Sequence, residues 1–312
     1  MFLVIHGMRS LNMIWDNQLD ADSFYRLQTL WVASCEKLLN IFPITMLGRL
    51  QNLGNLEITM CVSLENILQH QGPSASESQA LKSSQSTMVE TAINFEFPKV
   101  RRLILAGLPN LKSFYPQMHT TKWPSLETLV VFRCNQVQIL ASELLSYQRT
   151  SEETQLKSQN EHPLFWVNKA TFPSLVELTV LRNDSMKVMW YSDDVKEGIL
   201  YSKLETLKLK ALPRLESICS GSCNFEFPSL KDVLVMACPN MQTFSKGEVN
   251  TPKLQKVKLT EDEDERYWGD GVKMVMTLMK TGLTLYTSCM IKLMFEKVSR
   301  FSDAINITSL IY

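Results

Sequence analysis

The sequence predicts an α/β solenoid, with a parallel sheet on a concave face and irregular or short helical turns on a convex face. Two observations predict this fold. A segment that begins with an aromatic residue and a proline recurs along the chain, and each copy alternates apolar with variable residues, as a half-buried strand does. Further apolar positions follow each strand at spacings of three residues. One such unit cannot bury its apolar side alone, so we expect the copies to stack.

The clearest copy is FPKVRRLILAGLPNLKSF, residues 97–114. Its relatives span residues 123–140, 172–189, 201–218 and 227–244. Within residues 123–140, Leu129 and Val131 are the two core positions of the strand, and Cys134 is the first apolar position of the turn. If all copies share one register, the first core positions form a single buried row. That row is Leu103, Leu129, Leu178, Leu207 and Val233.

Weaker copies extend the repeat in both directions. Each unit is counted from the leucine or valine that precedes its strand. The units then start at Leu27, Leu53, Val100, Leu126, Leu175, Leu204, Leu230 and Leu254. Leu3 and Ile5 already occupy strand positions, so we expect the chain to begin inside the solenoid. The steps from Leu53 and from Leu126 are about twice as long as the others because each contains an insertion.

The two insertions, residues 69–91 and 142–161, are rich in Ser, Gln and Glu and show no apolar period. We expect them to be disordered loops on one side of the solenoid, because both enter at the same phase of the repeat. A linker that divides two domains is the alternative. The domain prediction is therefore a solenoid of about eight repeats over residues 1–268, with insertions at 69–91 and 142–161.

The end of the solenoid is predicted from charge. The acidic run EDEDE, residues 261–265, replaces the apolar steps after the last strand and would give the stack a polar end. Residues 269–312 form a divergent tail of uncertain structure. Residues 274–291 are apolar but contain Lys280, whose charge makes a membrane span costly. A short amphipathic helix or a non-native tail is the alternative for that segment.

The composition removes several classes of function. The formal net charge is +0, which gives no overall attraction to nucleic acid or to an anionic membrane. The four histidines fall in different repeats and insertions, and the chain has no G-x-x-x-x-G-K-[ST] phosphate loop. We therefore expect no catalytic residue, no cofactor and no metal site, and an enzyme is a poor alternative.

Six of the seven cysteines fall into two groups. Four occupy the same repeat position just after a strand, where a small buried thiol fits: Cys35, Cys61, Cys134 and Cys238. Cys219 and Cys223 could suggest a metal or redox site, but no second ligand pair accompanies them, and a loop between repeats explains them better. The sequon at Asn183 would carry a glycan only in a secreted protein.

The repeat matches L-x-x-L-x-L-x-x-N/C-x-L and resembles a leucine-rich repeat. Its proline-led form is similar to the repeat domain of plant disease-resistance proteins of the coiled-coil, nucleotide-binding, leucine-rich-repeat type, over roughly residues 3–268. The motif RYWGD at residues 266–270 also resembles the acidic, tryptophan-bearing end of that family.

This resemblance implies a cytoplasmic, non-catalytic recognition and regulatory domain in plant defence. The implied partners are a pathogen effector or a guarded host protein, and a nucleotide-binding domain of the same protein that the repeats hold inactive. A repeat adaptor that presents substrates to a ubiquitin ligase shares the architecture and is the alternative. An F-box-like helical segment upstream would distinguish it.

The candidate binding site is the exposed side of the strands. Residues beside the core positions should form a continuous concave surface. The site residues predicted there are Trp31, Ile104, Val130, Phe132, Arg133, Leu181, Arg182, Lys208, Lys210, Leu234, Met236 and Lys258. An apolar patch rimmed by Lys and Arg is typical of a protein-binding surface, with Trp31, Phe132 and Arg182 as the expected anchors. The alternative is that some of these side chains only pack on neighbouring strands.

Overall fold

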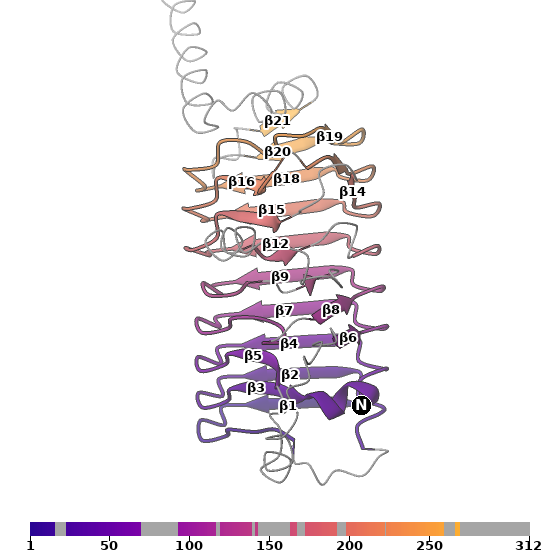
Figure 1. The fold of residues 1–312 in the computed structure, drawn as a ribbon, viewed down its shortest axis with the longest axis vertical. Coiled ribbons are helices and arrows are strands. Elements are labelled where there is room, and N and C mark those ends of the chain that lie inside the picture. The colour runs from indigo at the N-terminus through magenta and orange to yellow at the C-terminus, as the bar shows by residue number, and fades with distance from the viewer. Residues whose placement is uncertain are drawn as a thin grey trace, which may run out of the picture.

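The computed structural model describes residues 1–15, 23–69, 93–116, 119–138, 141–142, 163–166, 172–191, 198–221, 223–258 and 266–268. These residues wind into a solenoid with a ten-stranded sheet along one side (Figure 1). The strands of this sheet, in spatial order, are β1 (Phe2–His6), β2 (Thr29–Ala33), β4 (Asn55–Thr59), β7 (Arg102–Ala106), β9 (Thr128–Phe132), β12 (Glu177–Leu181), β15 (Thr206–Lys210), β18 (Asp232–Met236), β20 (Lys256–Lys258) and β21 (Arg266–Trp268).

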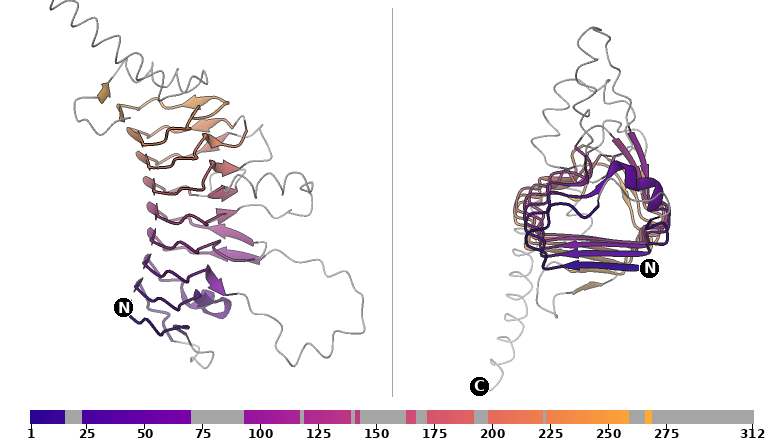
Figure 2. Two further views of the ribbon diagram at one scale, coloured as in Figure 1. Left: turned by 90° about the vertical axis from the view of Figure 1, so that its left-hand side faces the viewer. Right: turned by 90° about the horizontal axis from the view of Figure 1, so that it is seen from below.

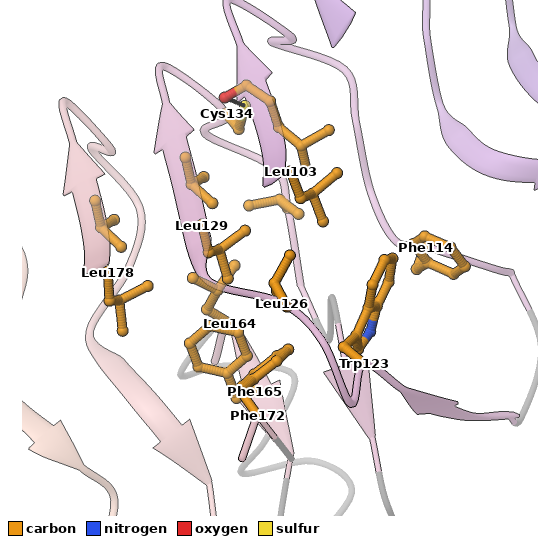
Figure 3. Close-up of a cluster of buried hydrophobic side chains, with 14 of the residues drawn as sticks. Leu103, Phe114, Trp123, Leu126, Leu129, Cys134, Leu164, Phe165, Phe172 and Leu178 are labelled. Atoms are coloured by element: carbon orange, nitrogen blue, oxygen red, sulfur yellow. Dashed lines mark hydrogen bonds between the residues drawn. The ribbon is translucent and has the colours of Figure 1, made fainter. Parts of the chain in front are cut away.

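The strands from β1 to β20 pair in parallel and in one register. Leu129 pairs with Leu103 on one side and with Leu178 on the other, and the same register continues through Leu207 to Val233. All five side chains are at most 2% exposed, which confirms the predicted buried row. Figure 3 shows Leu103, Leu129 and Leu178 on neighbouring strands, pointing into the same core. The alternation of core with variable residues along each strand sets this arrangement, because a slip of one residue would expose the whole row.

The two edges of the sheet differ. β1 pairs with β2 and has no described strand on its other side. At the opposite edge β21 pairs with β20 in antiparallel fashion, with Val257 opposite Tyr267. The motif that was predicted to end the repeats, residues 266–270, therefore begins with a strand, β21, which pairs with the outer edge of β20. The acidic run at residues 261–265 lies outside the described residues.

The other sides of the coil carry short strands where the sequence predicted irregular or helical turns (Figure 2). Within the described residues the helix is limited to one 3-10 element, η1 (Ile44–Arg49). The reason is composition, since these segments are rich in aromatic and β-branched residues, which favour strands. The short strands are β3 (Asn40–Pro43) with β5 (Asn66–Gln69); β6 (Ile93–Glu96) with β8 (His119–Lys122); β10 (Ala141–Ser142), β11 (Phe165–Trp166), β13 (Val188–Tyr191) and β16 (Ser217–Cys219); and β14 (Ile199–Leu200), β17 (Phe225–Glu226) and β19 (Val249–Asn250).

The aromatic residue that opens each repeat fills the core beside the sheet. These residues are buried in the five clear copies: Phe97, Trp123, Phe172, Tyr201 and Phe227. Phe97 stacks on Trp123 with ring centroids 4.5 Å apart, so the opening residues of two turns touch directly. Phe114 meets the same indole edge-on, at 5.4 Å (Figure 3). Such contacts add to area burial and hold successive turns together.

Several predicted segments lie largely or wholly outside the described residues. The insertions 69–91 and 142–161 do so apart from their ends, where Gln69 closes β5, Ser142 closes β10, and β10 and β11 flank the second insertion. The tail, residues 269–312, lies outside them entirely. In the part of the chain that the structure describes, no helix is both long enough and apolar enough to span a membrane.

Candidate protein-binding face

The outward side chains of the ten-stranded sheet form one surface, here called the outer face. Two rows of it follow directly from the strand register. The central row is Val4, Trp31, Glu57, Ile104, Val130, Thr179, Lys208, Leu234 and Lys258. The end row is His6, Ala33, Thr59, Ala106, Phe132, Leu181, Lys210 and Met236. The structure thus brings the predicted strand residues together on one side of the molecule.

Most predicted site residues remain partly exposed to solvent. Trp31 is 39% exposed, and Arg133 and Arg182 are exposed at the ends of β9 and β12. The half-buried members are Ile104, Val130, Phe132, Leu181, Lys208, Lys210, Leu234 and Lys258. A flat sheet produces this intermediate exposure because each side chain leans on neighbours from adjacent strands.

Met236 is the exception among the predicted site residues. Its side chain is only 6% exposed, so its assignment to the accessible surface was wrong. The thioether chain is flexible and uncharged, and burial against neighbouring side chains lowers its free energy. Lys210, which pairs with Met236 in the same row, remains half-buried because its ammonium group must reach water.

The outer face changes character along the stack. Its first part is mainly apolar, as at Val4, Trp31 and Ile104, with Glu57 between them. Its second part is mainly basic, although the chain as a whole has a formal net charge of +0. The basic residues there are Arg133, Arg182, Lys208, Lys210, Lys256 and Lys258, against Glu177 and Asp232. The face therefore offers a partner apolar contact and positive charge in adjoining regions.

One of these charges is neutralised within the face. The Lys208 Nζ atom lies 2.7 Å from Glu177 Oε1, between the neighbouring strands β15 and β12. The hydrogen bond from Lys208 lowers the pKa of the Glu177 carboxyl, and Thr179 donates a second hydrogen bond to the same oxygen. Glu177 was not among the predicted site residues, although it stands at a fixed position of the repeat, next to Leu178, the first core residue of its strand.

A row of left-handed residues borders the outer face. In the ten-stranded sheet, the residue after each strand from β1 to β18 has a positive φ. These residues are Gly7, Ser34, Met60, Gly107, Arg133, Arg182, Ala211 and Ala237. From Gly7 to Ala211 the backbone N–H of each donates to the last carbonyl of the next strand, as from Arg133 to Leu181 at 3.0 Å. A non-glycine residue in this conformation costs about 1 kcal/mol. Such bonds repeat along the stack and hold the turn in this conformation.

Two of these left-handed residues meet at one aromatic ring. The guanidinium carbon of Arg133 lies 5.2 Å from the centroid of the Phe132 ring, and that of Arg182 lies 5.9 Å from it. Both distances are within the range of a cation–π interaction. Phe132 and Leu181 are directly paired, so the two arginines follow paired residues on neighbouring strands. Arg133 follows Phe132 directly in the sequence, whereas strand register brings Arg182 to the same ring.

The cysteines of the turn are structural. Cys35, Cys61, Cys134 and Cys238 are buried free thiols, and each donates to the carbonyl two residues before it. Burial raises the pKa of Cys134 to about 12 and those of Cys61 and Cys238 to about 11. The thiols of Cys61, Cys134 and Cys238 therefore remain protonated at neutral pH and are poor nucleophiles and metal ligands. The prediction of buried cysteines at this position is confirmed.

Cys219, Cys223 and Asn183 were also singled out in the sequence. A disulfide joins Cys219, the last residue of β16, to Cys223 in the loop before β17, with Cα atoms 6.2 Å apart. Asn183 fills the cysteine position of its own repeat and is 1% exposed. Its Nδ2 donates to the carbonyl oxygen of Cys134 at 2.8 Å, so the folded chain cannot carry a glycan on that nitrogen. Within the described residues, no group of three or more His, Cys, Asp or Glu side chains is placed to hold a metal ion.

A solenoid in which each turn supplies one parallel strand, followed by a buried Cys, Asn or Leu, has the fold of a leucine-rich-repeat solenoid. Residues 3–147 match the family model for the leucine-rich repeats of plant disease resistance protein RPS2-like. Beyond the matched residues, β12, β15, β18 and β20 continue the same sheet in the same register. The match supports a repeat domain of the kind found in plant disease resistance proteins. No curated protein matches the chain.

Proposed function

We propose that this chain is a non-catalytic recognition module of plant immunity, which binds a protein partner through its outer face. The observation that carries the proposal is the continuity of that face. Strands separated by long stretches of sequence place Trp31, Val130 and Leu234 in one row. Among the described residues, no further layer of strands or helices packs over this row. A rigid, extended surface of this kind suits recognition of another protein.

The chemistry of the face supports protein binding over binding of a polyanion. Apolar side chains occupy the first part of the central row, while the cations of the second part are partly paired with acids. Apolar and aromatic contacts surrounded by positive charge are typical of protein interfaces. A nucleic-acid site would need a continuous basic track along a phosphate backbone.

The family match sets the biological context of the proposal. Residues 3–147 are similar to leucine-rich repeats of plant disease resistance protein RPS2-like. We infer that the partner is a pathogen effector or a host protein that such effectors modify. In a full-length receptor the same repeats would also hold a nucleotide-binding domain inactive, in the cytoplasm, until the partner binds.

Site-specific photo-cross-linking tests the proposal. A benzophenone amino acid at position 130 or 234 of the outer face should attach the chain to a discrete protein in challenged plant tissue. The matched controls carry the same amino acid at Leu39 and Leu200, which are 48% and 45% exposed but lie outside the ten-stranded sheet. The expected result is one partner from both face positions and none from the controls. Equal adducts from all four positions would contradict the proposal.

The sequence upstream in the gene provides an independent check of the context. A reading frame that encodes a phosphate loop before these repeats would support an immune receptor. An F-box-like helical segment in that place would instead support the ubiquitin-ligase adaptor. The outer face would bind a protein in either case, so the two experiments test separate parts of the proposal.

A further inference from the structure

Phe132, Arg133 and Arg182 form a compact cationic cluster at the border of the outer face. Both guanidinium groups lie within 6 Å of the centroid of one phenyl ring, at 5.2 Å for Arg133 and 5.9 Å for Arg182. Phe132 and Leu181 are paired neighbours in the end row, so the cluster has an apolar floor of two side chains. Two like charges are thus held close together on an apolar surface.

The backbone of the cluster is fixed in an unfavourable conformation. Arg133 and Arg182 both have a φ of 52°, in the left-handed region. In other repeats this position carries residues such as glycine, alanine or serine. Arg133 N–H donates to Leu181 O at 3.0 Å, and Arg182 N–H donates to Lys210 O at 2.8 Å. Strained residues that a structure holds firmly in place often belong to binding sites.

The charge of the cluster is not neutralised from within. Among the described residues, neither guanidinium is paired with a carboxylate, whereas Lys208 on the same face is paired with Glu177 at 2.7 Å. An approaching anion would relieve the repulsion between the two arginines, so the cluster favours a negatively charged group.

We propose that Phe132, Arg133 and Arg182 bind a carboxylate of an extended acidic segment in the protein partner. The inference rests on the proposed function and names the chemistry that the outer face recognises. The planar guanidinium forks donate paired hydrogen bonds to the carboxylate, while the Phe132 ring supports their faces. An apolar side chain next to the acidic residue packs on Phe132 and Leu181. The small size of the cluster and its apolar floor favour a carboxylate peptide over a polyanion.

Three fluorescent peptides test the inference with the whole chain. The first alternates leucine with glutamate, the second replaces every glutamate with glutamine, and the third replaces every glutamate with phosphoserine. Fluorescence anisotropy should show that the glutamate peptide binds at least about tenfold more tightly than the glutamine peptide. The binding should weaken as salt is raised to about 0.5 M, since exposed charges are screened.

Matched variants locate the site. The double variant Arg133→Gln/Arg182→Gln should bind the glutamate peptide at least about tenfold more weakly. Arg133→Lys/Arg182→Lys keeps the charge but loses the planar fork, so its affinity should fall between those of the wild type and the glutamine variant. The control Arg214→Gln/Lys253→Gln removes the same charge from exposed positions outside the strands and should bind like the wild type. Circular dichroism and melting curves verify that each variant is folded.

Several results would overturn the carboxylate site. They are equal binding by the double variant and the control, equal binding of the glutamate and glutamine peptides, absence of binding by the wild type, and preference for the phosphoserine peptide. None of them contradicts protein binding by the outer face, because cross-linking from positions 130 and 234 does not depend on the arginines. A discrete cross-linked partner without carboxylate binding would refute this inference and retain the proposed function.

Discussion

Asn183 shows how the repeat uses a single buried side chain. Its position in the turn is filled by Cys134 in the preceding repeat and by leucine in others. The Asn183 Oδ1 atom accepts hydrogen bonds from the backbone N–H of Met186 at 3.0 Å and of Ser185 at 3.2 Å. Its Nδ2 donates to the Cys134 carbonyl at 2.8 Å. One amide therefore satisfies backbone groups of its own turn and of the turn before it, which buried polar groups require.

Asn183→Ala should destabilise the chain by about 3 kcal/mol, because it removes these bonds and leaves buried backbone groups without partners. Asn183→Cys should cost less, since a thiol in this position can donate to the carbonyl two residues earlier, as Cys134 does at 3.4 Å. Urea unfolding monitored by circular dichroism measures both values. If the alanine variant is as stable as the wild type, the amide has no structural role.

The ion pair between Lys208 and Glu177 predicts a dependence on pH. Hydrogen bonding by Lys208 lowers the pKa of Glu177 in the folded state. A carboxyl with a lowered pKa stabilises the fold above its unfolded pKa, and this stabilisation is lost as the pH falls through the folded value. Because the pair is partly exposed to water, we expect it to contribute less than about 1 kcal/mol.

Lys208→Gln should therefore lower stability at pH 7, and the difference from the wild type should disappear as the pH falls through the lowered pKa of Glu177. The pKa of Glu177, followed by NMR titration, should rise in the variant. Lys253→Gln, at an exposed position outside the sheet, is the control and should leave that pKa unchanged. A difference in stability that stays constant down to acidic pH would mean that the hydrogen bond to Glu177 is not its cause.

At the scale of elements, the strand and the left-handed turn after it form the repeating unit. Each strand ends at a residue of the end row, and the chain then reverses direction through the left-handed residue. The N–H of that residue donates to the next strand, as from Ala211 to Met236 O at 2.8 Å. The turn therefore links neighbouring repeats and tolerates non-glycine residues because this bond offsets their strain.

Ala211→Gly should leave stability unchanged or raise it by up to about 1 kcal/mol, because glycine adopts a φ of 56° without strain. The same substitution at Ala106, within β7, should lower stability by about 0.5–1 kcal/mol, since glycine in a strand loses more conformational entropy. Thermal unfolding of the two variants compares them directly. Equal destabilisation at both positions would show that Ala211 carries no relievable strain in solution.

At the scale of the whole molecule, the two ends of the sheet are unequal. β21 covers β20 with an antiparallel pairing, whereas β1 has a described neighbour only in β2. The inward residues of β1, Leu3 and Ile5, are only half-buried, whereas the inward residues of the central strands are almost completely buried. In a linear stack each turn is stabilised mainly by contacts with its neighbours, so local stability should decrease toward β1.

Hydrogen exchange should therefore be at least about tenfold faster for the bonded amides of β1 than for those of β9. Adding a strand partner at the β1 edge should slow exchange in β1 and leave β18 unchanged, because the two lie far apart in the stack. Mass spectrometry of peptides from each strand measures the exchange rates. Equal protection of β1 and β9 would indicate that the solenoid opens as one cooperative unit.

The sequence by itself determined the strands, their common register and the buried rows. Leu129 and Leu178 share one environment because each stands at the same position of a strand that alternates core with variable residues, after the same aromatic-proline start. This information is local, and the repetition of one pattern restricts the way in which copies stack. The outer-face positions of Trp31 and Lys208 could be predicted for the same reason.

Only the tertiary structure decided how side chains meet across strands. The left-handed conformation at Arg133 and Arg182 depends on hydrogen bonds to the next strand, and the meeting of both arginines at Phe132 depends on the packing of two turns. Met236 is buried although its position in the pattern points outward. These features arise from contacts between residues that lie far apart in the sequence, and an alternation of apolar and polar residues specifies the side of a strand but not the neighbours found there.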